Sequence, residues 1–108
     1  MRPDKVLSLL GIAAKAGSVM SGEFSTEKAI KEGKACLVVV AGDSSDNTKK
    51  NFSDMCRYYQ VPCVCYADKE SLGHSIGKEF RASLAVTNEG LAKSVRKQLD
   101  SVATESWR

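Results

Sequence analysis

The sequence is poor in several features that mark other classes of protein. No apolar run approaches the roughly 20 residues that a membrane-spanning helix needs, so we expect no membrane association. Glycine and proline, at 8 and 2 of 108 residues, are not enriched, which argues against a collagen-like or disordered chain. The nucleotide-binding patterns G-x-x-x-x-G-K-S/T and G-x-G-x-x-G are both missing.

The cysteines lack the spacing of a metal or disulfide framework. Cys36, Cys56, Cys63 and Cys65 contain no C-x-x-C pair, and the single histidine, His74, is not at zinc-ligand spacing from any of them. All four lie in or beside apolar runs, so we interpret them as small buried hydrophobic residues of a reducing compartment. We expect no metal and no cofactor.

What is present is the composition of one compact domain over residues 1–108, with a loosely ordered tail from about residue 103. The chain is 43% hydrophobic and 27% charged, as in ordinary globular proteins. A net charge of +3 permits a polyanionic partner without requiring one. Asp4 and Lys5 interrupt the N-terminal apolar segment, which argues against a signal peptide, and we expect a cytoplasmic protein.

Hydrophobic periodicity predicts helices that alternate with strands, and this order is typical of an α/β sheet covered on both faces. The run at 35–42 is β-branched and continuous, which indicates a central strand buried on both sides. Other strands are expected at 18–20, 61–67 and 82–87, and helices at 3–16, 22–32, after 43–46, at 68–77 and at 89–102. The expected inward side chains of the last three helices are Thr48, Phe52, Met55, Cys56, Tyr59, Leu72, Ile76, Leu91, Val95, Leu99 and Val102.

The stretch SGEFSTEKAIKEGK predicts a helix with an unusual outer face. Ser21 is the expected N-cap. At about 100° per residue, Thr26, Ala29 and Ile30 share one face, which suits a core. Phe24, Lys28 and Lys31 fall on the opposite face. Two interpretations stay open: the ring stacks on an unpaired base beside phosphate-binding lysines, or it folds back on the preceding segment above a solvated face.

A second segment repeats this combination. LGHSIGKEFRA ends a helix at Gly77 and places Lys78, Phe80 and Arg81 in a loop. It is again basic, aromatic and hinged by glycine. Two such segments at the ends of strands predict a site for single-stranded or bulged RNA.

Catalytic interpretations are weaker. Asp43 follows a buried strand, where a phosphoacceptor or magnesium site is conceivable, but no second acidic cluster accompanies it, so we favour a capping turn. His74 has no nucleophile or orienting group near it in sequence, so we expect a solvent-facing side chain. The chain is therefore expected not to be an enzyme.

The motifs GIAAKAGSVMSGEFSTEKAIKEGKACLVVVAGDSSDNTKKNF, CRYYQVPCV, LGHSIGKEFRASLAVT and GLAK, in this order, resemble the kink-turn RNA-binding ribosomal proteins. This is the L-seven-Ae / L-thirty-e family, and the nearest pattern is its bacterial YlxQ-type branch. The resemblance runs from about Leu7 to Lys93. It implies a three-layer α-β-α sandwich with a small mixed sheet, no catalysis, and binding to a bent duplex with tandem G·A pairs.

The resemblance also implies which residues meet RNA. By position the helix-tip glycine is Gly22 and the helix lysine is Lys28. The loop residues are Lys78, Glu79, Phe80, Arg81 and Ala82, with the Gly42 and Asp43 turn beside them. The chain departs from the family at Phe24 and Ser25, where Asn-Glu usually reads guanine edges, and Glu23 can substitute only in part. We therefore expect weaker or altered RNA specificity.

The leading hypothesis is thus a monomeric, non-catalytic RNA-binding protein, ribosomal-protein-like, that acts in a ribonucleoprotein. The alternative is a protein–protein adaptor on the same fold. A third class, a regulator that binds nucleotide or phosphate through Asp43, is the least favoured.

Overall fold

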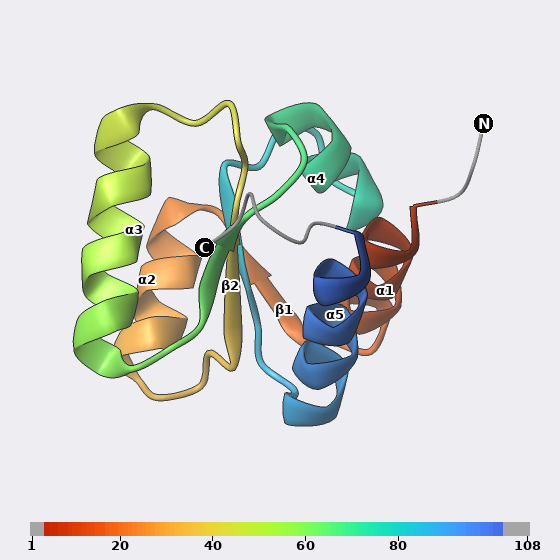
Figure 1. Cartoon of the computed structure of the whole chain (residues 1–108), viewed down its shortest axis with the longest axis horizontal. Coiled ribbons are helices and arrows are strands. Elements are labelled where there is room, and N and C mark those ends of the chain that lie inside the picture. The colour runs from red at the N-terminus through yellow and green to blue at the C-terminus, as the bar shows by residue number, and fades with distance from the viewer. Residues whose placement is uncertain (1–3, 103–108) are drawn as a thin grey trace.

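The computed structural model describes residues 4–102, with side chains up to residue 100. Five helices and four strands follow one another along the chain (Figure 1). Pro3, the side chain of Val102 and the expected loose tail lie outside the described part. The elements are α1 (Lys5–Lys15), β1 (Val19–Ser21), α2 (Glu23–Lys31), β2 (Leu37–Val40), α3 (Asp46–Tyr59), β3 (Cys63–Cys65), α4 (Lys69–Ser75), β4 (Ser83–Val86) and α5 (Glu89–Val102).

The sheet is small and mixed, as expected. Its strand order is β1-β4-β2-β3. Strand β4 is antiparallel to both β1 and β2, whereas β2 and β3 are parallel. The predicted strand at 35–42 is confirmed as an inner strand, and all four residues of β2 are buried. Strands β2, β3 and β4 are shorter than predicted, whereas β1 has the predicted length and is shifted by one residue.

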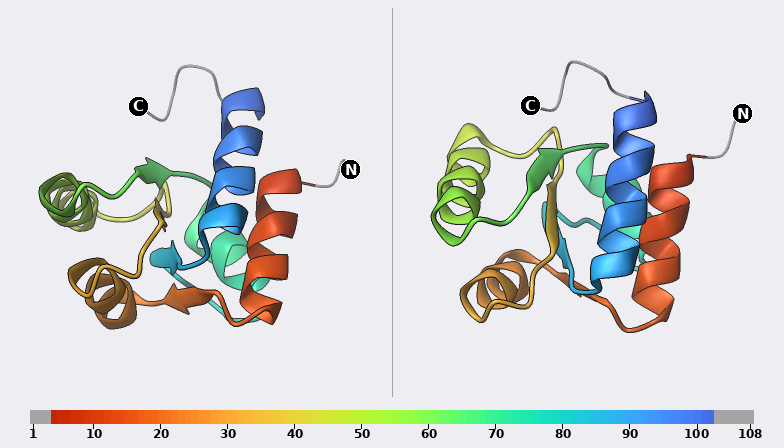
Figure 2. Two further views of the ribbon diagram at one scale, coloured as in Figure 1. Left: turned by 90° about the horizontal axis from the view of Figure 1, so that it is seen from below. Right: turned by 60° about the horizontal axis from the view of Figure 1, so that its bottom comes forward.

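Helices cover both faces of the sheet, so the molecule has three layers (Figure 2). On one face lie α1, α4 and α5, and on the other lie α2 and α3. Successive side chains of a strand point to opposite faces. Leu37 and Val39 accordingly belong to the α1/α4/α5 core, whereas Val38 and Val40 pack with Phe52 of α3. The expected α-β-α sandwich is confirmed.

Four of the five described helices, all but α2, begin where a short polar side chain accepts a bond from the first turn. Asp4 accepts from the backbone N–H of Leu7, Ser45 from Thr48, Asp68 from Ser71 and Asn88 from Leu91. The last helix has the predicted bounds because both its cap and its stripe are local signals.

Two predictions about individual side chains are wrong. Tyr59 does not join the inner stripe of α3; it is 40% exposed and meets Tyr58 edge-on, with ring centroids 4.9 Å apart. Cys65 is exposed rather than buried, because β3 is an edge strand.

Candidate functional site

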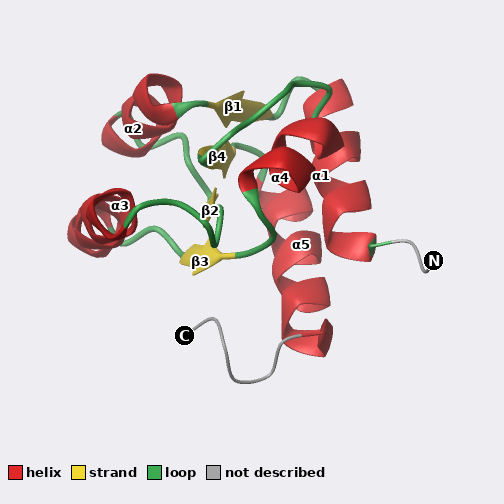
Figure 3. Cartoon of the chain, turned by 90° about the horizontal axis from the view of Figure 1, so that it is seen from above, coloured by secondary structure: helices red, strands yellow, loops and turns green. Residues whose placement is uncertain are grey.

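The two segments singled out in the sequence lie side by side at one end of the sheet (Figure 3). Ser21, the last residue of β1, pairs with Leu84 of β4. The next backbone N–H, that of Gly22, donates to the carbonyl oxygen of Ser83 at 3.0 Å. Arg81 Nε donates to Ser21 Oγ at 3.2 Å. Residues 60 positions apart are thereby joined, and the start of α2 abuts the loop that precedes β4.

The tip of α2 is open to a ligand. Gly22, not Ser21, is the N-cap, so the predicted Ser21 cap is wrong: its hydroxyl is an acceptor for Arg81 instead. Gly22 adopts φ +93°, which side chains disfavour, and no neighbouring heavy atom lies within 4 Å of where a Cβ would stand. A helix start leaves its first backbone N–H groups without intrahelical partners, and no side chain of the N-cap residue accepts from those of α2.

The outer face of α2 carries the predicted aromatic and basic residues. Phe24 is 77% exposed, which excludes the interpretation in which its ring folds back. Lys28 and Lys31 are exposed on the same helix, and Glu23 is exposed at its first position. Ser25 is half-buried. The inner residues Thr26, Ala29 and Ile30 are buried as predicted, so the helix is held by one face and presents the other.

The loop of residues 76–82 presents a second ring. Phe80 is 64% exposed, and Lys78 and Glu79 are exposed beside it. Two backbone bonds fix the loop against α4: Lys78 N–H donates to the Gly73 carbonyl at 2.9 Å, and Arg81 N–H donates to the Lys69 carbonyl at 3.1 Å.

Gly73 makes that approach sterically possible. A Cβ at Gly73 would lie 1.5 Å from the carbonyl oxygen of Glu79. The sequence analysis missed this role. Its only signal was a glycine inside a helix, where glycine is unfavourable unless packing requires it.

Arg81 both holds the loop in position and carries a positive charge. Its Nη1 donates to the carbonyl of Phe80 at 2.8 Å, in addition to the bond from Nε to Ser21. A guanidinium has five N–H donors, so others remain for a ligand. Part of the hydrogen-bonding capacity of the Arg81 guanidinium is therefore already used within the protein, unlike that of the Lys28 and Lys78 ammonium groups.

The turn after β2 completes this end of the sheet and is built as a cap. Gly42 N–H donates to the Ala67 carbonyl at 2.7 Å, and Ala41 N–H donates to the Ala82 carbonyl at 2.8 Å. Asp43 Oδ1 accepts from the N–H of Lys69 at 2.9 Å. The capping interpretation of Asp43 is confirmed, although the helix that it caps is α4 rather than α3.

The acidic side chain of Asp68 has a structural role at this end of the sheet. Backbone and hydroxyl bonds from Ser71 lower the pKa of Asp68, so it is ionised when it caps α4. His74 is exposed on α4, as expected. Within residues 4–102 no cluster of three or more His, Cys, Asp or Glu side chains is arranged to hold a metal ion.

Most cations of this surface are not held by carboxylates. Ion pairs in the described part of the chain join Lys34 to Glu32 at 3.4 Å and Lys50 to Asp54 at 2.9 Å. Lys28, Lys31 and Lys78 take no part in either. Their charges are therefore available to an anionic partner.

Comparison with known proteins identifies a family for this chain. Residues 4–96 match the ribosomal protein L7Ae/L30e/S12e/Gadd45 family. The chain belongs to that family. The RNA-binding protein YlxQ of Bacillus subtilis is 44% identical over 92 residues, which are 85% of this chain and 92% of that protein. The RNA-binding protein YlxQ of Enterococcus faecium is 35% identical over 97 residues, covering 90% and 93%. The resemblance drawn from the motifs is confirmed, and so is the expectation of a non-enzymatic protein.

Solved structures agree on the fold. A Bacillus halodurans protein of unknown function superposes with a TM-score of 0.88 at 35% identity. The match covers 91% of this chain and 99% of that protein. The Giardia lamblia 15.5kD RNA binding protein superposes with a TM-score of 0.75 at 20% identity, covering 96% and 92%. Among the described residues, no helix has the length and apolarity to cross a membrane.

Proposed function

We propose that the protein binds structured RNA, as a monomer, through a surface that we call the α2 tip surface. It comprises Gly22, Glu23, Phe24, Ser25, Lys28, Lys31, Gly42, Asp43, Lys78, Glu79, Phe80, Arg81 and Ala82. The observation that carries the proposal is the hydrogen bond between Arg81 and Ser21, which joins two exposed-aromatic segments into one surface. Two relatives over most of the chain are named as RNA-binding proteins.

The chemistry of the surface suits an RNA with unpaired bases. Phe24 and Phe80 each present a largely exposed ring on which an unstacked base can lie. Lys28, Lys31 and Lys78 supply contacts to phosphate, which makes the affinity depend on salt. Gly22 lets a backbone or base approach the free N–H groups of the helix.

The specific target that we propose is a kink-turn or a related bulged duplex. In the family, the glycine-led helix enters the widened groove at the G·A pairs, and the loop covers flipped-out nucleotides. Here the base-reading Asn-Glu positions hold Phe24 and Ser25, so stacking replaces part of the edge readout. Each lost edge contact costs about 1–3 kcal/mol by analogy with base recognition in DNA. We expect a kink-turn preference with reduced affinity.

The test is a binding titration with a labelled kink-turn RNA and with the same RNA in which Watson–Crick pairs replace both G·A pairs. Each is titrated at low and moderate salt with the wild-type protein and Lys28→Ala. We expect tighter binding to the kink-turn, and a loss of affinity in the variant because one phosphate contact is removed. The matched control is Lys5→Ala, an exposed lysine at the start of α1.

Two results would contradict the proposal. Equal binding to both RNAs would mean that the α2 tip surface does not recognise the kink. Unchanged affinity in Lys28→Ala, with Lys5→Ala also unchanged, would remove α2 from the interface. Tight binding of a protein in place of RNA would favour the adaptor hypothesis.

A further inference from the structure

A cleft of about 330 Å³ lies at the other end of the sheet from the α2 tip surface. Its walls are the residues that precede β2 and β3 and the first turns of α5, including Cys36, Gln60, Pro62, Glu89, Lys93 and Arg96. Strand β2 begins directly after Cys36, which lines this cleft, and ends two residues before Gly42 of the α2 tip surface. Six residue steps from Cys36 to Gly42, at about 3.3 Å each, separate the two surfaces by roughly 20 Å.

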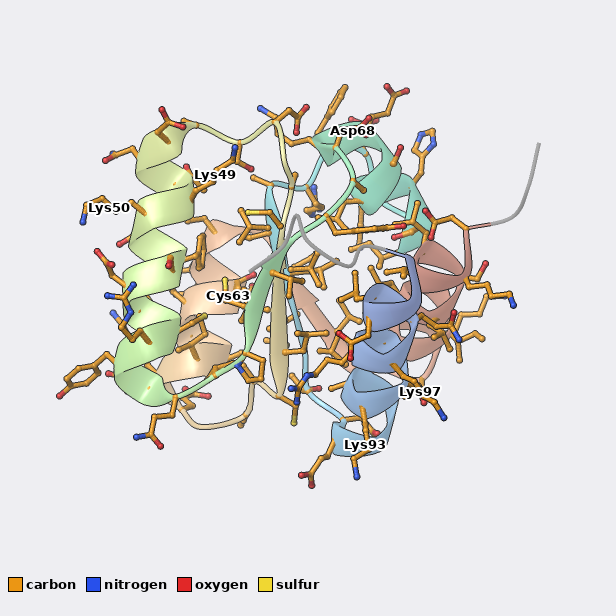
Figure 4. The ribbon with its side chains drawn as sticks, viewed as in Figure 1. Lys49, Lys50, Cys63, Asp68, Lys93 and Lys97 are labelled. Carbon is orange, nitrogen blue, oxygen red and sulfur yellow. The ribbon has the colours of Figure 1, made fainter. Side chains whose placement is uncertain are left out.

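Two cations of α5, Lys93 and Arg96, line this cleft, and Lys97 lies beside them on the same helix. Lys93, Arg96 and Lys97 are spaced i, i+3 and i+4, so they share one side of the helix. All three are exposed. Figure 4 shows Lys93 and Lys97 projecting from the lower part of α5, at the opposite end of the molecule from Asp68. Within residues 4–102 neither ion pair involves them.

A neutral donor accompanies these charges. Gln60 lines the cleft and adopts a left-handed backbone at φ 60°, ψ 46°. An amide and clustered cations form the kind of surface that binds a nucleic-acid backbone. The core of a protein–protein interface is depleted of charged residues, whereas Glu89, Lys93 and Arg96 line this cleft.

We propose that Gln60, Lys93, Arg96 and Lys97, which we call the far-end surface, bind the phosphate backbone of a second segment of the RNA held at the α2 tip surface. The protein would then bridge two parts of one RNA across its sheet. The proposal rests on RNA being the ligand under the proposed function. Charge complementarity selects phosphate as the occupant, because the cleft holds two cations against the single carboxylate of Glu89.

The experiment compares two RNAs. One is a minimal kink-turn, and the other is the same element with single-stranded flanks long enough to cross the molecule, whose longest extent is 37 Å. The slope of log affinity against log salt is measured for wild type, for the Lys93→Ala/Arg96→Ala double variant and for a Lys5→Ala/Lys50→Ala control. The control removes the same charge from exposed sites on α1 and α3. Circular dichroism checks that each variant is folded.

On the flanked RNA, the double variant should lower the slope by roughly 1.4, because each phosphate contact on a single strand contributes about 0.7. The minimal RNA should show no change. Equal slopes for the double variant and the control on the flanked RNA would overturn the proposal, and so would an equal loss on both RNAs.

The Lys28→Ala variant on the minimal RNA separates the two proposals. A drop there, with no effect of the double variant on the flanked RNA, would leave the α2 tip surface standing and remove the far-end surface. No drop there, with a lowered slope for the double variant, would contradict the α2 tip surface and, with it, the bridge between two segments of one RNA, and would leave only phosphate binding by the far-end surface.

Discussion

Tyr66 and Asp4, which are 62 positions apart, are joined by a hydrogen bond of 2.8 Å from the phenol oxygen to Oδ2 of the carboxylate. The other carboxylate oxygen accepts from the N–H of Leu7 and caps α1. One side chain thus starts a helix and ties it to the segment that follows β3.

This contact gives stability a dependence on alkaline pH. Burial, and then the hydrogen bond to Asp4, raise the pKa of Tyr66 to about 12. In the unfolded chain the phenol ionises near pH 10. The protonated phenol therefore contributes stability that is fully present below about pH 10 and is lost as the pH rises toward 12. We expect the melting temperature of Tyr66→Phe to fall less between about pH 8 and pH 11 than that of wild type. If the melting temperatures of the variant and of wild type fell in parallel with pH, ionisation of Tyr66 would not be linked to folding stability.

Gly73 should tolerate no side chain. We expect Gly73→Ala to lower the free energy of unfolding by at least about 2 kcal/mol, because its Cβ would overlap the Glu79 carbonyl and push the loop away. Denaturant unfolding measures this. Gly90→Ala is the control: its Cβ would lie 3.4 Å from the Asn88 side chain in an exposed helical turn, so alanine should be neutral or stabilising by up to about 1 kcal/mol. Similar values for the two variants would refute the steric argument.

The exposed rings should matter for binding and little for folding. Phe24→Ala and Phe80→Ala should each weaken binding to the minimal RNA by about 1–3 kcal/mol, the range measured for base stacking. Their unfolding free energies should stay within about 0.5 kcal/mol of wild type because both rings are exposed. Tyr58→Ala, an equally exposed ring at the end of α3, should leave this affinity unchanged. Loss of stability without loss of affinity would assign the rings to packing.

Restoring the family's side chains should restore base readout. The double variant Phe24→Asn/Ser25→Glu gains two edge contacts of about 1–3 kcal/mol each and loses the stacking of the Phe24 ring, which is worth about 1–3 kcal/mol. It should therefore bind the kink-turn roughly 10-fold more tightly than wild type. It should gain nothing on the RNA whose G·A pairs are replaced. Fluorescence anisotropy with both RNAs measures the ratio. An equal gain on both would point to a general effect on charge or shape.

The sequence predicted the features that depend on neighbouring residues. The continuous apolar run that contains Leu37 to Val40 indicated a strand buried on both faces. The cap of α5 was expected at Asn88 or Thr87, and Asn88 holds it. Both signals lie within a few positions of the element that they predict. The core face of α2 followed from helical periodicity.

Features that depend on distant pairing were missed. Ser21 has the chemistry of an N-cap, yet its place in β1 opposite Leu84 turns its hydroxyl toward Arg81. The role of Gly73 depends on a loop that folds back over α4, which no local pattern encodes. The residues of the candidate site were proposed from the resemblance of the motifs to the family. Whether the Phe24 ring is exposed could be decided only from the tertiary structure.

The position of β4 in the sheet has a consequence for synthesis. This strand lies between β1 and β2, although it is the last of the four to leave the ribosome. Until residues 83–86 emerge, β1 has no neighbour to pair with and the inner edge of β2 is bare. Non-local pairing of this kind delays folding, so a nascent chain stalled before β4 should remain sensitive to protease. The same late strand brings Arg81 to Ser21, so the α2 tip surface would be assembled only after β4 has emerged.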